Sequence, residues 1–163
     1  MRHFVGRYLL VAALAASAPP AHADHHEMSE EAQAIAAARV VMDQFMAAFN
    51  SRDVVAWAET LLFPHVRVAG SGVSIVDTKA EFVAQTDLEA FARIENWDHS
   101  AWDTVEVIQA GPDKVHFKVR FDRFNPEGEN YVSYDSLYVV QKVDGRWGVR
   151  ARSSYAGVSS ALR

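Results

Sequence analysis

The stretch from Asp98 to Tyr155, DHSAWDTVEVIQAGPDKVHFKVRFDRFNPEGENYVSYDSLYVVQKVDGRWGVRARSSY, decides the fold. It predicts four consecutive β-strands joined by three short turns, at residues 110–113, 125–128 and 144–145. Asp144-Gly145 is the strongest turn signal, because both residues tolerate the positive φ that a two-residue type I′ hairpin requires. An antiparallel meander that follows a mostly helical first half predicts an α+β fold.

The first half of the chain carries helix signals. Ser29 can cap a helix that runs to about Phe49, and Asp53 can cap a second, short helix to about Leu62. Thr78 and Glu81 have the spacing of a capping box and predict the start of a third helix. The apolar residues of the first helix recur three and four positions apart, which predicts one buried stripe: Ile35, Ala38, Met42, Phe45 and Phe49.

Residues 65–69 and 73–77 predict a β-hairpin across Gly70-Ser71-Gly72, because Pro64 ends the second helix before them. The third helix carries Phe82, Val83, Phe91 and Ile94. The overall order is therefore two helices, a hairpin, a third helix and a long meander.

Residues 1–23 predict a cleavable secretory signal peptide. Arg2 and Arg7 supply the positive start, residues 8–18 are apolar and uncharged, and Ala21-His22-Ala23 is a small-x-small cleavage site. We expect cleavage after Ala23 and export to the periplasm or the medium; the alternative is an uncleaved anchor or a disordered arm. Residues 24–29 are then a disordered start, residues 30–156 the domain and residues 157–163 a C-terminal tail.

Charge and cysteine content restrict the partners. The chain has 16 Lys and Arg against 21 Asp and Glu, and cleavage would remove two arginines and no acid, which changes the net charge from −5 to −7. An acidic chain without a basic run argues against nucleic acid or an anionic membrane as a partner. With no cysteine, the chain forms no disulfide and has no lipoprotein anchor.

The order of elements resembles the nuclear transport factor 2-like superfamily, in its SnoaL-like branch. The resemblance covers residues 30–156 and rests on Phe49–Asp53 at the first helix junction, Phe63–Arg67 on the first strand and Lys142–Trp147 at the last hairpin. It implies a cone-shaped fold in which a curved sheet wraps helices around an internal pocket. Members include isomerases, dehydratases, cyclases and non-catalytic binding or assembly domains, so the resemblance implies no single chemistry.

The last hairpin predicts which side chains face the pocket. With Asp144-Gly145 as the loop, Val143 pairs with Arg146, and neighbours across a ladder share a face. The inner face, which also holds Trp147, then receives these pairs: Tyr134 with Tyr155, Ser136 with Ser153, Tyr138 with Ala151, and Val140 with Val149. The outer face receives Asp135, Leu137, Val139, Arg150 and Arg152. This mixture of apolar and charged residues predicts a homodimer through the outer sheet face.

The two preceding strands differ in how clearly their apolar and polar residues alternate. Val115, Phe117, Val119 and Phe121 alternate with polar residues and are expected inside; His116 and Arg120 are expected outside, with Arg120 near Asp135. The strand from Trp97 to Ala110 allows either face. The SnoaL-like resemblance favours His99 and Asp103 in the pocket, because members have a histidine at the strand's start and a polar residue four positions later.

Candidate site residues follow from these orientations. His99 is a candidate general acid or base and Asp103 a candidate base, although they lie ~13 Å apart and form no dyad. The alternative is that His99 sits at the sheet edge and Asp103 caps a turn or pairs with arginine. Candidate ligand-binding residues are His65, Trp102, Tyr134, Ser136, Tyr138, Ser153 and Tyr155.

No cofactor is expected, and the folded part shows no metal-ligand spacing. A cleaved chain would begin Asp24-His25-His26, which resembles the amino-terminal Cu(II) and Ni(II) motif. Three functions stay open. One is cofactor-free isomerisation, dehydration or cyclisation of a small apolar carbonyl compound. The second is non-catalytic binding of a hydrophobic metabolite. The third is an assembly domain whose cavity is filled by Phe45, Phe82, Phe91 and Trp102.

Overall fold

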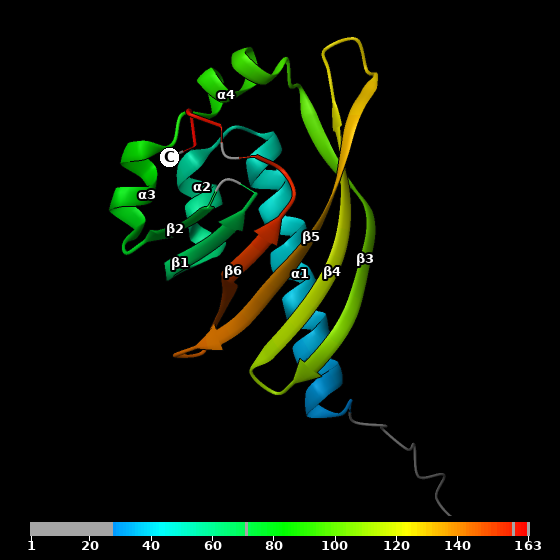
Figure 1. The fold of residues 1–163 in the computed structure, drawn as a ribbon. Coiled ribbons are helices and arrows are strands. Elements are labelled where there is room, and N and C mark those ends of the chain that lie inside the picture. Colours follow the sequence, from blue (N-terminus) through cyan, green and yellow to red (C-terminus); the bar gives the residue numbers. More distant parts are fainter. Residues whose placement is uncertain (1–27, 71, 158, 163) are drawn as a thin grey trace, which may run out of the picture.

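A computed structural model describes residues 28–70, 72–157 and 159–162. One six-stranded sheet, in the order β2-β1-β6-β5-β4-β3, carries the helices on one face (Figure 1). All neighbouring strands are antiparallel except β1 and β6, which are parallel. This confirms the predicted α+β fold. The predicted signal peptide, most of the disordered start and the Asp24–His26 motif lie outside the described residues.

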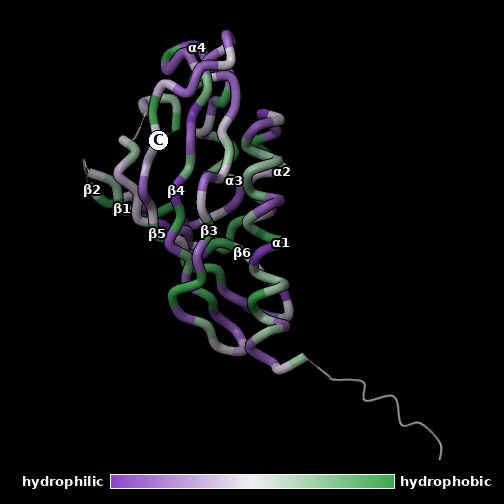
Figure 2. Tube along the Cα trace, turned by 90° about the vertical axis from the view of Figure 1, so that its right-hand side faces the viewer, coloured by the Kyte–Doolittle hydropathy of each residue, from purple (hydrophilic) through white to green (hydrophobic). Residues whose placement is uncertain are grey.

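The first two helices begin at the predicted capping residues. Helix α1 (Glu30–Asn50) begins where the Ser29 hydroxyl accepts a hydrogen bond from the Ala32 amide, at 3.2 Å. Helix α2 (Val54–Glu59) begins at Asp53, whose carboxylate accepts from the Ala56 amide at 2.9 Å. Helix α1 lies against the inner face of the sheet (Figure 2) and buries the predicted stripe, apart from the half-buried Ile35.

The predicted third helix is two helices, α3 (Lys79–Gln85) and α4 (Leu88–Glu95). Thr86 has an extended backbone between them, and the Asp87 carboxylate caps α4 by accepting from the Ala90 amide at 2.8 Å. Asp87 donates its own amide to the carbonyl of Ala161 at 2.9 Å. The break between α3 and α4 is therefore hydrogen-bonded to Ala161, near the end of the chain. The expectation of one continuous helix was wrong.

The hairpin and the meander form as predicted, except that α2 ends at Glu59 and β1 begins at Leu61, so that Pro64 lies within the strand. Strands β1 (Leu61–Ala69) and β2 (Gly72–Val76) make the hairpin. Strands β3 (His99–Gly111), β4 (Lys114–Phe124), β5 (Asn130–Val143) and β6 (Arg146–Ser154) make the meander. Val115, Phe117 and Val119 are fully buried, as their alternation predicted. Burial of such side chains contributes ~1.5–3 kcal/mol each.

The register of β5 and β6 changes at Arg150. Val143 pairs with Arg146 and Val140 with Val149, as predicted, but Tyr138 then pairs with Arg152 and Ser136 with Ser154. An extra residue in one strand exchanges its faces beyond that point. Arg152 and Ser154 are therefore inside and Ser153 outside, with Tyr155 82% exposed beyond the strand's end. The expected inner positions of Ser153 and Tyr155, and the outer position of Arg152, were wrong.

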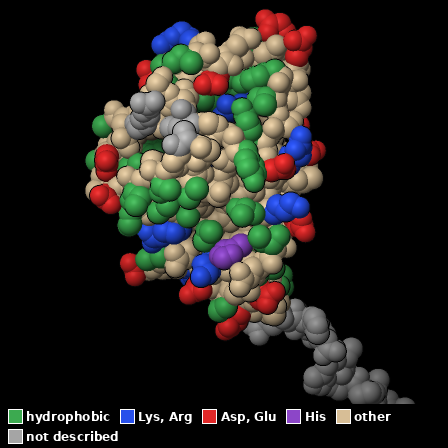
Figure 3. Space-filling model, viewed as in Figure 1, with side chains coloured by type: hydrophobic (Ala, Val, Ile, Leu, Met, Phe, Trp, Pro, Cys, Tyr) green, Lys and Arg blue, Asp and Glu red, His purple; other side chains and the backbone are tan. Residues whose placement is uncertain are grey.

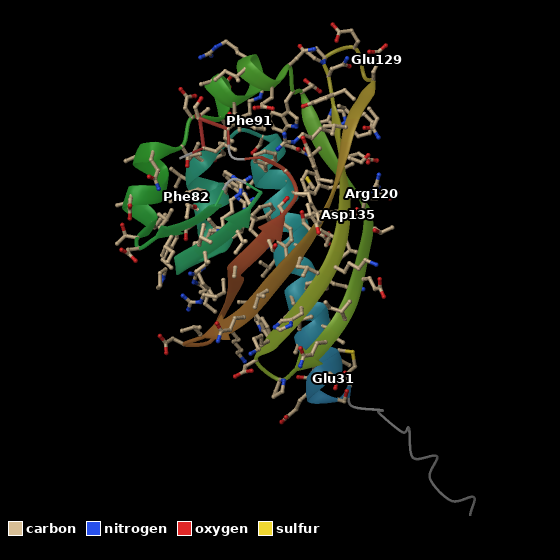
Figure 4. All side chains as sticks on the ribbon, viewed as in Figure 1. Glu31, Phe82, Phe91, Arg120, Glu129 and Asp135 are labelled. Atoms are coloured by element: carbon tan, nitrogen blue, oxygen red, sulfur yellow. The ribbon has the colours of Figure 1, made fainter. Side chains whose placement is uncertain are left out.

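A second irregularity lies at Asp103. Trp102 pairs with Phe121 and Thr104 with Arg120, so that Asp103 has no partner in the ladder. Ser100 and Trp102 consequently share the inner face with Val105 and Val107, while His99 and Asp103 lie on the outer side. The expectation that His99 and Asp103 face the pocket was wrong. Arg120 and Asp135 do meet outside, at 3.4 Å, as predicted (Figure 4).

Candidate functional site

Two adjoining cavities lie between the helices and the inner face of the sheet. An inner chamber of about 30 Å³ is walled mainly by α1, β3, β4 and β6. An outer chamber of about 290 Å³ lies between α3 and the strands β1 and β2. They share a wall made by four residues: Trp57, Arg67, Arg152 and Leu162.

Aromatic rings occupy much of the inner chamber. Phe45 of α1 stacks on Trp102 of β3 at 6.5 Å between ring centres and meets Tyr138 of β5 edge-on at 5.5 Å. Trp102 and Tyr138 also meet edge-on, at 5.6 Å. Edge-on and offset contacts of this kind are the favoured aromatic geometries. The chamber is consequently far smaller than the ~300 Å³ at which ligand pockets begin, and the outer chamber is close to that size.

Of the four residues expected to fill a cavity, two do so in the inner chamber. Phe45 and Trp102 line it, whereas Phe82 of α3 forms part of the outer chamber's wall. Phe91 of α4 is packed in the core against Phe49 and Trp97, at 5.7 and 5.3 Å between ring centres. Figure 4 labels Phe82 and Phe91 on their two helices.

Arg67 brings a positive charge into the shared wall. It alternates with His65 on the inner face of β1 and is 7% exposed. Its Nη2 donates to the carbonyls of Gly157 at 2.9 Å and Ala156 at 3.4 Å. Among the described residues no carboxylate lies within 4 Å of it. Burial, followed by the positive charge of Arg152, lowers the pKa of Arg67 to about 9, so it stays charged at neutral pH.

Arg152 and Arg123 are held by aromatic rings. The guanidinium carbon of Arg152 lies 5.5 Å from the ring centre of Phe45 and 5.4 Å from that of Trp57. The guanidinium carbon of Arg123 lies 4.9 Å from the Phe91 ring centre, and its nearest carboxylate is Glu95 at 3.8 Å. Cation–π contact compensates only part of the lost hydration of a buried guanidinium.

His65 is a neutral side chain in the wall of the outer chamber. It is 3% exposed, and its Nδ1 donates to the carbonyl oxygen of Val149 at 3.0 Å. Burial, followed by the charge of Arg152, lowers the pKa of His65 to about 3. At neutral pH the ring therefore carries its proton on Nδ1, and Nε2 has a free lone pair.

Six buried side-chain nitrogens in the described residues have no hydrogen-bond partner, and all six belong to residues that line these chambers. Five are donors and one, His65 Nε2, is an acceptor while the ring is neutral. Each unsatisfied buried group costs about 1–3 kcal/mol. They are Trp57 Nε1, His65 Nε2, Arg67 Nε, Trp102 Nε1, Arg123 Nε and Arg152 Nε.

The structure brings together part of the predicted ligand-binding set. His65 lines the outer chamber, and Trp102 and Tyr138 line the inner one. Ser136 is buried next to the inner chamber, and the Ser136 hydroxyl donates to the Ser154 hydroxyl at 2.7 Å. Tyr134 packs on Phe121, with 5.6 Å between ring centres. Ser153 and Tyr155 are exposed and lie apart from this group.

The two candidate catalytic residues are partnered on the outer side. His99 stacks on Phe124 with ring centres 4.7 Å apart, and its Nδ1 lies 2.8 Å from the Asp98 carboxylate. Asp103 lies 3.8 Å from Arg120. Neither side chain lines a chamber, so neither can move a proton on a molecule held there.

Sequence reasoning missed the three arginines of the site. Arg67 has the parity of His65, and Arg123 continues the alternation of Phe117, Val119 and Phe121, so strand period could have found both. Arg152 gave no such signal, because the irregularity at Arg150 reverses its face.

No group of three or more metal-ligating side chains occurs in the described residues. No helix among them is long and apolar enough to cross a membrane.

A bent sheet that holds helices over a lined internal cavity defines the NTF2-like, cone-shaped class of α+β proteins. The chain belongs to the family described as "NTF2-like protein (DUF6841)", whose model matches residues 30–156. This confirms the superfamily that the sequence resembled; the narrower SnoaL-like branch stays a prediction. No curated protein matches the chain.

Solved structures with the same fold are distant in sequence. A protein with a cystatin-like fold from Nostoc punctiforme PCC 73102 is 16% identical with a TM-score of 0.59, over 77% of this chain and 92% of the other. A ketosteroid isomerase-like protein from Erwinia carotovora atroseptica SCRI1043 is 19% identical with a TM-score of 0.54, over 74% and 93%. A putative calcium/calmodulin dependent protein kinase II association domain from Xanthomonas campestris is 17% identical with a TM-score of 0.54, over 78% and 88%. Such identities show a shared fold alone.

Proposed function

We propose that this protein is a non-catalytic small-molecule-binding domain, whose ligand occupies the outer chamber and reaches the shared wall. One observation carries the proposal: all six unpartnered buried nitrogens of the described residues line the two chambers. Buried polar groups are normally hydrogen-bonded, so groups left unpaired call for a partner that the protein itself does not supply. A bound molecule with polar atoms would supply the missing partners.

The second candidate is cofactor-free acid–base chemistry, such as isomerisation, dehydration or cyclisation of a carbonyl compound. The ketosteroid isomerase-like neighbour favours it at the level of fold. With His99 and Asp103 outside, His65 is the chamber residue best placed to accept a proton. A base whose pKa is about 3 is weak at neutral pH. Binding therefore fits the geometry better than turnover.

Native mass spectrometry of protein purified from its own host tests the proposal. We expect a small molecule that is released on denaturation, or, if it is lost on purification, stabilisation of the protein by compounds in a thermal-shift screen. Phe82→Ala, in the wall of the outer chamber, should reduce either signal, whereas Ile108→Ala, an exposed change on β3, should not. Absence of both signals in the native protein would contradict a binding function.

We also propose that the protein is exported after cleavage near Ala23 and forms a homodimer through the outer sheet face. Apolar side chains gather on this face over β1 and β2 (Figure 3). The strand pairings place Val68 and Val73 opposite each other there, with Val66 opposite Ile75, and Leu137 lies on the same face of β5. A second copy of this face would cover it by two-fold symmetry.

A further inference from the structure

The shared wall concentrates positive charge without a negative partner. Arg67 and Arg152 both belong to it, and Arg123, whose nearest carboxylate is Glu95 at 3.8 Å, lines the inner chamber. None of the described residues that line either chamber is an aspartate or glutamate. A buried guanidinium is normally paired with a carboxylate, because its lost hydration is otherwise only partly replaced.

Three unpartnered donors meet at this wall: Arg67 Nε, Arg152 Nε and Trp57 Nε1. Arg67 cannot turn freely, because its Nη2 is already held by the carbonyls of Ala156 and Gly157. Arg152 is likewise fixed between the rings of Phe45 and Trp57. The wall is thus a set of donors held in place by these contacts, and its residues border both chambers.

From this arrangement we infer that the ligand is a small organic acid, whose carboxylate binds between Arg67 and Arg152 at the shared wall. A carboxylate has two oxygens with about four acceptor positions, enough for the three donors. Charge-assisted bonds from guanidinium to carboxylate are the strongest hydrogen bonds of this kind. The inference rests on the proposed binding function and names the class of ligand.

The outer chamber suits the rest of such a molecule. Phe82, Val76 and Leu162 give it apolar surface, and about 290 Å³ is enough for a compact body of aliphatic or aromatic carbon. The inner chamber, of about 30 Å³, leaves little space beyond the carboxylate. The site therefore favours an organic acid over the neutral, apolar carbonyl compound expected from the sequence. A neutral compound would leave both guanidinium charges uncompensated.

The pKa values of His65 and Arg67 agree with the absence of a negative charge near these two residues. The pKa of His65 and that of Arg67 are both lowered, first by burial and next by the charge of Arg152. A bound carboxylate would oppose the charge contribution to both shifts. Arg67 and Arg150 also contribute to the lowering of the pKa at His65, so the positive field comes from both β1 and β6.

Calorimetric titration of the purified protein at neutral pH tests the inference with matched probes. Benzoate, phenylacetate and hexanoate are compared with their neutral amides, each at up to about 10 mM, which detects millimolar affinity. Inorganic phosphate is the other anion. We expect at least one carboxylate to bind and its amide to bind at least about tenfold more weakly, because the amide lacks the charge.

Two variants and one control locate the site. Arg152→Met should weaken carboxylate binding about tenfold or more, and Arg152→Lys should also weaken it, since lysine keeps the charge but lacks the Nε donor. Arg120→Met removes an arginine of the outer face and should change nothing. Circular dichroism confirms the fold of each variant, and Arg152→Lys serves if Arg152→Met does not fold.

The outcomes separate the two proposals. Amides that bind as tightly as the acids, or acids that bind to both Arg152 variants as tightly as to the native protein, would overturn the carboxylate site and leave a small-molecule-binding domain. Binding of phosphate without any carboxylate would overturn the ligand class. If every probe fails and the native protein also retains no ligand and responds to no compound, the binding function itself fails with it.

Discussion

The guanidinium of Arg152 lies against the indole of Trp57, with its central carbon 5.4 Å from the ring centre, and both residues stand in the wall between the two chambers. Each also carries a buried nitrogen that has no hydrogen-bond partner among the described residues. The pair is therefore stabilised by packing and by cation–π attraction but lacks an acceptor and a counter-charge. This pairing suits a site that is complete only when a ligand is bound.

A functional Arg152 should reduce the stability of the unliganded protein. Arg152→Met keeps most of the side-chain volume and removes an uncompensated charge, so we expect a gain of about 1–2 kcal/mol in the free energy of unfolding without ligand. Urea unfolding measures it. Arg120→Met, on the exposed outer face, should stay within about 0.5 kcal/mol of the native protein. A loss of stability in Arg152→Met alone would show that Arg152 serves the fold.

His65 should make the protein less stable in acid. Its pKa is about 3 in the folded protein and near 6.5 when exposed. Below pH 6.5 the unfolded chain therefore binds a proton that the native state does not, and stability falls as the pH falls toward 3. Relative to His65→Gln, the native protein should lose about 1.4 kcal/mol more per pH unit in this window. Parallel pH profiles from urea unfolding would contradict a buried neutral His65.

The outer face should control subunit number. Leu137 is 47% exposed on β5, on the same outer face as the apolar residues of β1 and β2 but separated from them by β6, and Leu137→Glu would place a charge in the proposed interface. We expect the dimer to become a monomer of the same fold, as light scattering after gel filtration would show. Val40→Glu changes a residue of α1 that is 54% exposed, and this variant should remain dimeric. A native protein that is already monomeric would refute the interface.

His99 and Asp103 should be dispensable for binding. Because both side chains lie on the outer side, with partners at Asp98 and Arg120, His99→Ala and Asp103→Asn should bind ligand as tightly as the native protein. The same holds for turnover if any is found. A tenfold loss in either variant, measured by calorimetry with the native ligand, would show that these residues reach the site in solution.

Gly148 should tolerate no side chain. A Cβ at this position would lie 2.9 Å from the Leu62 side chain and 3.2 Å from the backbone of Leu61 and Thr60. We expect Gly148→Ala to cost about 1–3 kcal/mol, because this contact joins the start of β1 to β6. Gly70→Ala meets no atom within 4 Å and is the control. Equal melting temperatures for the two variants would contradict this close approach.

Local signals predicted most of the fold. Ser29, Asp53 and Thr78 accept hydrogen bonds from the backbone amides that begin their helices, as their spacing indicated. Asp144 and Gly145 both have positive φ, as the hairpin requires. The regular alternation from Val115 to Phe121 was enough to orient β4. These features depend on neighbours within a few positions, so the sequence contains them directly.

The candidate site was predicted in part. His65, Trp102 and Tyr138 line the chambers, but the acid–base pair His99 and Asp103 does not. An extra residue in β3 caused this error, and one in β6 caused the error at Ser153 and Tyr155, because side chains alternate with a period of two and one insertion exchanges the faces. The arginines that dominate the site were missed for a further reason: a buried arginine is uncommon, and composition alone places it on the surface.

Sequence by itself determined the order of the elements, the helix starts and the tight turns, because each of these is set by residues close together in the chain. Tertiary structure alone decided the irregularity at Arg150. There the Val149 amide donates to Thr60 and its carbonyl accepts from His65, while Arg150 donates to the Pro64 carbonyl. These bonds join residues more than 80 positions apart. They form only when β1 lies beside β6, and they turn Arg152 inward to meet Arg67 in the chamber wall.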